Sequence, residues 1–188
     1  PTSPGSIIIL IGSQKGFCGT FNVALFKFFE IQTPKINAAD GIIAIGKKAS
    51  DYLRKKKIVP LEVFNNLSST SLLNITDLLT NFIIRQLPNY KEVIVISNDP
   101  KTFFTQKPEK ITLLPMIPLS SKESASDTYI WPEPHEEILQ ALSRLYLKVS
   151  IESLLFSSLV AEQAARFHSM DSATRNAEDM LEVMHRDY

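Results

Sequence analysis

A glycine-rich segment follows the first apolar run of the sequence. It reads Gly-Ser-Gln-Lys-Gly-Phe-Cys-Gly over residues 12–19, at the kind of strand-to-helix junction where phosphate-binding loops occur. A P-loop would end in Gly-Lys followed by Ser or Thr, and a dinucleotide loop would carry glycines in the pattern G-x-G-x-x-G. Because neither pattern is present, we interpret the segment as a tight turn whose glycines allow close backbone packing. Nucleotide binding by residues 12–19 is the alternative interpretation.

The cysteine and histidine residues show no pattern for catalysis or metal binding. Cys18 is the only cysteine, and the histidines at 135, 168 and 185 lie far from it in the sequence. A nucleophilic cysteine needs a nearby base, so we predict a buried structural thiol. The four side chains also lack the spacing of zinc ligands, and one cysteine cannot form an internal disulfide. We therefore predict no catalytic residue, no metal site and no cofactor.

Alternating apolar runs and amphipathic segments indicate an α/β fold. Apolar, β-branched runs at 7–11, 41–46 and 92–97 predict buried strands, and the segments 17–30, 47–57 and 72–86 predict helices. Prolines interrupt the chain from 100 to 134 except at 111–114, which predicts an edge strand. The order predicts a small open sheet with helices on both faces, in a Rossmann-like domain over residues 1–134 that ends in a Pro-rich connector. The expected apolar stripe of the third helix comprises Ile75, Leu78, Leu79, Phe82 and Ile83.

Charge and hydropathy exclude two classes of partner. The chain carries 20 Lys and Arg against 20 Asp and Glu, so it lacks the positive field of most nucleic-acid binders. The longest apolar run, 7–11, is far shorter than the roughly 20 residues that span a membrane. The charge is unevenly distributed, because residues 1–60 carry nine Lys and Arg against three Asp and Glu, a net of +6 that the remaining residues cancel. We expect contact with a membrane only through partners.

The C-terminal segment predicts one very long helix. Residues 135–187 contain neither Pro nor Gly, and a helix of that extent is about 80 Å long at 1.5 Å per residue. Apolar residues recur in steps close to four and three. This stripe is Ile138, Leu142, Leu145, Val149, Phe156, Leu159, Phe167, Met170, Ala177, Leu181 and Met184.

The stripe cannot all be buried against a sheet of this size, so we expect the helix to extend beyond the domain and to pair with another helix. Polar residues at Glu152, Gln163 and Thr174 interrupt the stripe. Small residues in the second half predict a close approach to a single partner helix. They are Ala161, Ala164, Ala165, Ala173 and Ala177.

Two segments resemble the gamma subunit of rotary F-type ATP synthases, the central shaft of that enzyme. The first is similar to the family stretch S-x-x-G-L-C-G-x-x-N, with Phe17 in place of Leu and Thr20 in place of a second Gly. The second is similar to S-E-x-A-A-R-x-x-A-M-x-x-A-T-x-N-A, with conservative departures at Ala161 and Ser169. The matching residues include Ser13, Gly16, Cys18, Gly19, Asn22, Glu162, Ala165, Arg166, Met170, Thr174 and Asn176.

The resemblance implies a non-catalytic rotor shaft. In the family, a long N-terminal helix pairs with the C-terminal helix inside the α₃β₃ ring, and the α/β domain contacts subunit ε and the membrane c-ring. The present chain lacks that N-terminal helix and the family's last C-terminal turns, so we expect it to be a fragment of a longer product that is peripheral on the cytoplasmic face of a bacterial inner membrane. A self-pairing coiled-coil module is a further alternative.

The shaft interpretation assigns candidate contacts of the foot with its partners. These are Tyr129, Trp131 and Glu133 in the connector, together with the basic run Arg54, Lys55, Lys56 and Lys57. A merely solvated surface is the alternative for both groups.

Overall fold

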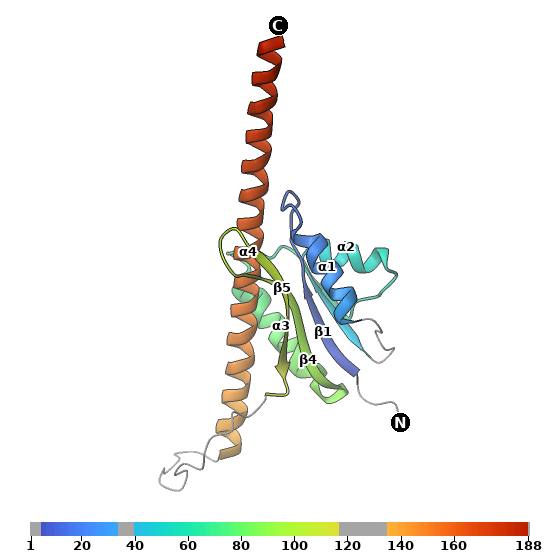
Figure 1. Cartoon of the computed structure of the whole chain (residues 1–188). Helices are drawn as coiled ribbons and strands as arrows, with labels where there is room; N and C mark the ends of the chain where they lie inside the picture. Colours follow the sequence, from blue (N-terminus) through green and yellow to red (C-terminus); the bar gives the residue numbers. More distant parts are fainter. Residues whose placement is uncertain (1–4, 34–39, 117–134, 188) are drawn as a thin grey trace.

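The computed structural model describes residues 5–33, 40–116 and 135–187. It shows an α/β domain with one helix that runs past it and projects far beyond it (Figure 1). The elements in chain order are β1 (Gly5–Ile11), α1 (Phe21–Gln32), β2 (Gly41–Ile45), α2 (Lys47–Lys55), β3 (Glu62–Phe64), α3 (Leu72–Gln86), the 3₁₀ turn η1 (Leu87–Asn89), β4 (Tyr90–Pro100), β5 (Gln106–Leu114) and α4 (His135–Asp187).

The five strands form one sheet in the order β3-β2-β1-β4-β5. Strand β1 is central and buried along its whole length, and it pairs in parallel with β2 and β4. Strand β5 lies at the edge, as predicted, but it is antiparallel to β4 and longer than the predicted 111–114. It continues through Pro108, which an edge strand tolerates because its outer side needs no ladder hydrogen bond.

Two helix boundaries differ from the prediction for a common reason. The first helix begins at Phe21 instead of Phe17, because Phe17 and Gly19 adopt positive φ angles of 62° and 53°. The second helix ends at Lys55, and Lys57 has a φ of 60°. Left-handed residues interrupt a right-handed helix. The three-residue strand β3 was not predicted, since so short a segment shows no periodicity.

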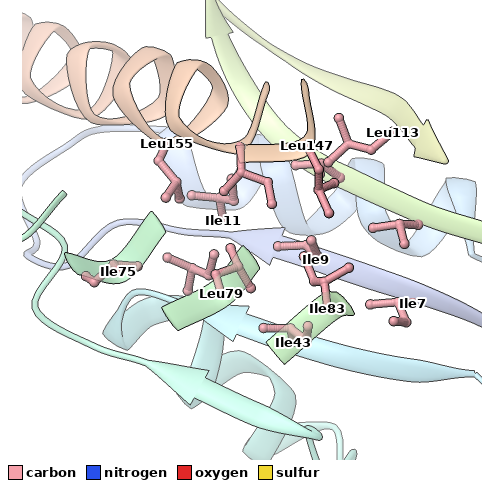
Figure 2. Close-up of a cluster of buried hydrophobic side chains, with 14 of the residues drawn as sticks. Ile7, Ile9, Ile11, Ile43, Ile75, Leu79, Ile83, Leu113, Leu147 and Leu155 are labelled. Atoms are coloured by element: carbon pink, nitrogen blue, oxygen red, sulfur yellow. The ribbon is translucent and has the colours of Figure 1, made fainter. Parts of the chain in front are cut away.

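Helices cover both faces of the sheet, as predicted. On one face, Ile7, Ile9 and Ile11 of β1 pack against α3 and the middle of α4 (Figure 2). On the other face, Ile8 and Leu10 pack against α1 and α2. The alternation of β1 side chains thus builds two apolar cores from one strand.

Helix α4 has two apolar faces, of which the sequence analysis found one. Leu147, Ile151 and Leu155 are buried against the sheet and α3, and none of them belongs to the predicted stripe. Most of the predicted stripe is exposed; Leu159 is its buried exception. The stripe residues more than half exposed are Leu142, Leu145, Val149, Phe156, Phe167, Met170, Leu181 and Met184. On α3, the predicted core residue Leu78 is likewise exposed.

Because the two faces differ in burial, we expect truncation of a side chain to lower the free energy of unfolding more on one face than on the other. Leu155→Ala should lower the free energy of unfolding of the 188-residue chain by about 2–5 kcal/mol, because it leaves a cavity in the core. Leu145→Ala, on the exposed face of the same helix, should change it by about 0.5 kcal/mol or less. Urea denaturation followed by circular dichroism measures both. Equal costs would contradict the two-faced arrangement.

Candidate functional site: the junction between the β1–α1 loop and α4

The turn after β1 is packed tightly against the turn after β2. A Cβ atom on Gly12 would lie 2.9 Å from the backbone nitrogen of Ala49, and one on Gly46 would lie 2.3 Å from the carbonyl oxygen of Gly12. Gly46 also has a φ of 86°. Glycine is therefore required where the two turns meet. This supports the tight-turn interpretation for Gly12, whereas a Cβ on Gly16 would meet nothing within 4 Å.

The backbone amides of this loop bind a carboxylate from α4. Gln14 N–H donates to Oε2 of Glu162 at 3.1 Å, and Lys15 N–H donates to Oε1 at 3.4 Å. The Glu162 side chain is buried and forms an ion pair with Arg166 one turn later. Arg166 Nε also donates to the Gly16 carbonyl at 3.3 Å. We call this group of contacts the Glu162–Arg166 latch.

A second set of contacts holds the loop in shape from within. Ser13 N–H donates to Asn22 Oδ1 at 3.1 Å, and Asn22 Nδ2 donates to Ser13 Oγ at 2.8 Å. Asn22 Nδ2 also contacts the Cys18 sulfur at 3.2 Å. Cys18 is buried and packs with Phe21 and two alanines of α4. The structure therefore agrees with the prediction of a buried structural thiol.

The small residues of α4 lie in two different environments. Ala161, Ala164 and Ala165 are buried in the domain, and Ala161 and Ala165 pack against Cys18 and Phe21. The prediction that this part of the small-residue cluster faces a partner helix is wrong, since the domain's own loop takes that space. Ala173 and Ala177 are exposed beyond the domain.

The motif residues fall into two groups, one at the junction and one on the projecting part of α4. The junction brings together Ser13, Cys18, Asn22, Glu162, Ala165 and Arg166, which come from segments nearly 150 positions apart. Gly19 lies beside Ser169, whose Cβ would be 3.8 Å from a Cβ at that glycine. Met170, Thr174 and Asn176 are exposed on the projecting part of α4 and take no part in the junction.

The sequence analysis missed two residues of the junction. The side-chain oxygen of Gln14 accepts the N–H groups of Lys47 and Asn66 at 3.2 and 2.9 Å, so it ties three loops together. Asn66 has a φ of 62°. The sequence offers only a weak indication of Asn66, because asparagine is enriched in the left-handed region. It offers no indication of Gln14, since a single glutamine between two glycines belongs to no known motif.

A hollow of about 550 Å³ opens beside the latch, and it is large enough for a small ligand. Its polar lining includes Gln14, Lys15, Glu162, Gln163 and Arg166. A phosphate at this loop would need the amides of Gln14 and Lys15, but the Glu162 carboxylate already occupies them. The geometry therefore opposes nucleotide binding. Among the described residues, no group of three or more His, Cys, Asp or Glu side chains is placed to hold a metal ion.

The basic run lies at the end of α2, on the sheet face opposite α4. Lys56 forms an ion pair with Glu30 at 2.5 Å, and Tyr52 donates to the same carboxylate at 2.9 Å. These hydrogen bonds from Lys56 and Tyr52 lower the pKa of Glu30. Burial, followed by the neighbouring Glu30, raises the pKa of the Tyr52 phenol above its usual range. Tyr129, Trp131 and Glu133 lie outside the described residues.

The fold and the junction define a class of protein. It is an α/β domain that holds the middle of a projecting helix, and a carboxylate of that helix accepts the backbone amides of the β1–α1 loop. A family model described as ATP synthase matches residues 2–188. The chain therefore belongs to the ATP synthase family, and the resemblance to the gamma subunit is confirmed. Within the described residues, no helix combines the length and apolarity needed to cross a bilayer.

Curated relatives and solved structures agree with this assignment. The ATP synthase gamma chain of Clostridium perfringens is 28% identical over 193 residues, which cover 99% of this chain and 66% of the relative. That of Helicobacter pylori is 32% identical over 192 residues, covering 94% and 63%. The chain thus spans slightly less than two thirds of the length of these relatives.

A central stalk chain of the Tetrahymena thermophila mitochondrial ATP synthase has the same fold, with a TM-score of 0.70 at 19% identity. The match covers 91% of this chain and 77% of that chain. A rotor chain of the Euglena gracilis enzyme also has a TM-score of 0.70, at 13% identity, over 98% of this chain and 72% of that chain.

The latch predicts a large energetic difference between two carboxylates of α4. Glu162→Ala should lower the free energy of unfolding by about 3 kcal/mol, because it leaves Arg166 and two backbone amides without their charged acceptor. Asp171→Ala is the matched control, since Asp171 forms an exposed pair with Arg175 at 3.0 Å on the same helix. Its cost should be about 0.5 kcal/mol.

Urea denaturation of the two variants provides the measurement. A double-mutant cycle with Arg166→Met then isolates the coupling between Glu162 and Arg166. If Glu162→Ala costs no more than Asp171→Ala, the latch does not hold the helix.

Proposed function

We propose that the chain is the rotor shaft subunit of an F1Fo ATP synthase, which couples ion-driven rotation at the membrane to ATP synthesis on other subunits. It carries no catalytic residue of its own in this proposal. One observation supports it above the others: a 53-residue helix is held by its middle on a domain while a second apolar face stays exposed along its length. A shaft needs this combination of a firm attachment and a long projecting surface.

We propose a division of labour along the chain. Residues 1–134 form the foot, and residues 135–188 form the shaft. The Leu147–Leu155 core contact and the latch join them, so that rotation of the foot turns the helix. A joint with both an apolar core and a charged lock resists twisting better than either alone, because rotation of α4 about its own axis would break both sets of contacts.

The proposal includes the partners of the complete subunit. The exposed stripe pairs with an N-terminal helix of the same gene product, and the coiled coil enters the ring of alpha and beta subunits. The foot contacts subunit epsilon and the membrane c-ring, with Tyr129, Trp131, Glu133 and the basic run Arg54–Lys57 as candidate contacts. The protein contacts the membrane through these partners and binds no nucleic acid.

We place the protein at the cytoplasmic face of a bacterial inner membrane. Support comes from the curated relatives, whose sources include Helicobacter pylori.

The stripe predicts that one charge disrupts assembly without unfolding the domain. Met170→Asp should reduce at least about tenfold the amount of complete subunit that copurifies with alpha and beta subunits, because it buries an unpaired charge between two helices. Ser172→Asp is the matched control, since two residues turn about 200° around the helix and leave the stripe.

Both variants should unfold like the unchanged 188-residue chain, because Met170 is more than half exposed there. Equal copurification of the two variants would count against the shaft.

The alternative, a small regulatory domain that binds a nucleotide at residues 12–19, predicts a different result. Titration calorimetry of the 188-residue chain with ATP and with NAD should show no saturable heat up to about 1 mM, because Glu162 holds the loop amides that a phosphate requires. Saturable binding in the micromolar range would favour the regulatory domain instead.

A further inference from the structure

The β4–β5 hairpin carries two exposed aromatic side chains at its tip. Phe103 and Phe104 are 52% and 68% exposed. The turn that presents them is well formed, because Thr102 and Thr105 exchange backbone hydrogen bonds of 3.2 Å. At its base, Lys101 forms ion pairs with Asp99, at 3.0 Å, and with Glu109. A hydrogen-bonded turn with two adjacent exposed phenylalanines is typical of an interaction surface.

The turn between β4 and β5 lies beside α4 (Figure 1). The Phe103 ring meets the Phe167 ring edge to face, with centroids 5.6 Å apart. Phe104 meets His168 with centroids 6.1 Å apart. Phe167 belongs to the predicted stripe and is still more than half exposed. The hairpin therefore widens the apolar surface of the stripe on one side and leaves its centre open.

The other side of the stripe is bounded at the same level. The hollow beside the latch is lined by residues 66–69 and by Leu159, Gln163 and Arg166. Gln163, Phe167 and Met170 follow one another in steps of four and three, so they share one side of α4. The stripe is therefore flanked by Phe103 on one side and by the loop 66–69 on the other. We call this stretch of the stripe the seat and the two flanking segments its walls.

We propose that Phe103 and Phe104 form one wall of the seat for the N-terminal helix that, under the proposed function, pairs with α4. The inference rests on the proposed shaft function. Helices α1, α2 and α3 all pack on the sheet, so none of the described helices is available to cover the stripe. The curated relatives extend over about a third of their length beyond the match.

The diameter of a helix supports direct contact with the hairpin. A helix with its side chains is about 10 Å wide, so one lying on Phe167 and Met170 reaches the wall beside Phe167. The partner helix therefore needs apolar residues on two adjoining faces at this level, one toward α4 and one toward the hairpin. A simple two-helix coiled coil needs only the first.

Photocrosslinking in the assembled ATP synthase tests the proposal. Photoreactive p-benzoylphenylalanine replaces Phe104, Met170 or Val23 in the complete gene product, and mass spectrometry maps the crosslinked peptides. Val23 is the control, because it is 68% exposed on α1, which packs on the face of the sheet opposite α4. The probe at 104 should give at least about tenfold more crosslink to the segment before residue 1 than the probe at 23, since crosslinking needs van der Waals contact.

The position 170 probe separates the two proposals. If 170 crosslinks to that segment and 104 crosslinks only to α4, to another subunit or to a second copy, the hairpin wall is overturned and the shaft stands. If neither position reaches the segment, both are overturned. Equal crosslinking from 104 and 23 also overturns the wall, because it would show no preference for the hairpin side.

Discussion

The buried carboxylate of Glu162 is the contact on which the arrangement of domain and helix depends. It satisfies the amides of Gln14 and Lys15 and pairs with Arg166, whose guanidinium continues to the Gly16 carbonyl. A buried charge is tolerated only when it is paired and hydrogen-bonded, so each partner constrains the others. The loop cannot change shape without leaving the carboxylate unsatisfied, and the helix cannot turn without leaving the loop.

This contact also places a carboxylate of the same chain where related α/β folds bind a ligand. In nucleotide-binding domains of similar topology, the amides after the first strand receive a phosphate. Here an internal anion occupies the same position, and the anion is attached to the helix that projects from the domain. The interaction that could have bound a ligand instead fastens the projecting helix, in a chain that belongs to the ATP synthase family.

The two apolar faces of α4 differ in what they contact: one packs on the domain, and the other is exposed. Leu147, Ile151 and Leu155 are buried in the core of the domain, while the predicted stripe is largely exposed. Periodicity found the stripe because its steps of four and three run along most of the helix. It missed the shorter core face, since three residues at intervals of four are not distinguishable from background in a helix with apolar residues on several sides.

The amino-acid sequence by itself determined the helix at 135–187, the three shorter α-helices and the described strands other than β3, because β-branched runs and the absence of Pro and Gly act locally along the chain. It also identified the motif segments, including Cys18 and Glu162, through their resemblance to a family. Only the tertiary structure decided that Glu162 reaches the loop amides, that Ala161 packs on Cys18, and that Phe103 meets Phe167. These contacts join residues far apart in the chain, and their geometry depends on how the sheet, the turns and the long helix pack together.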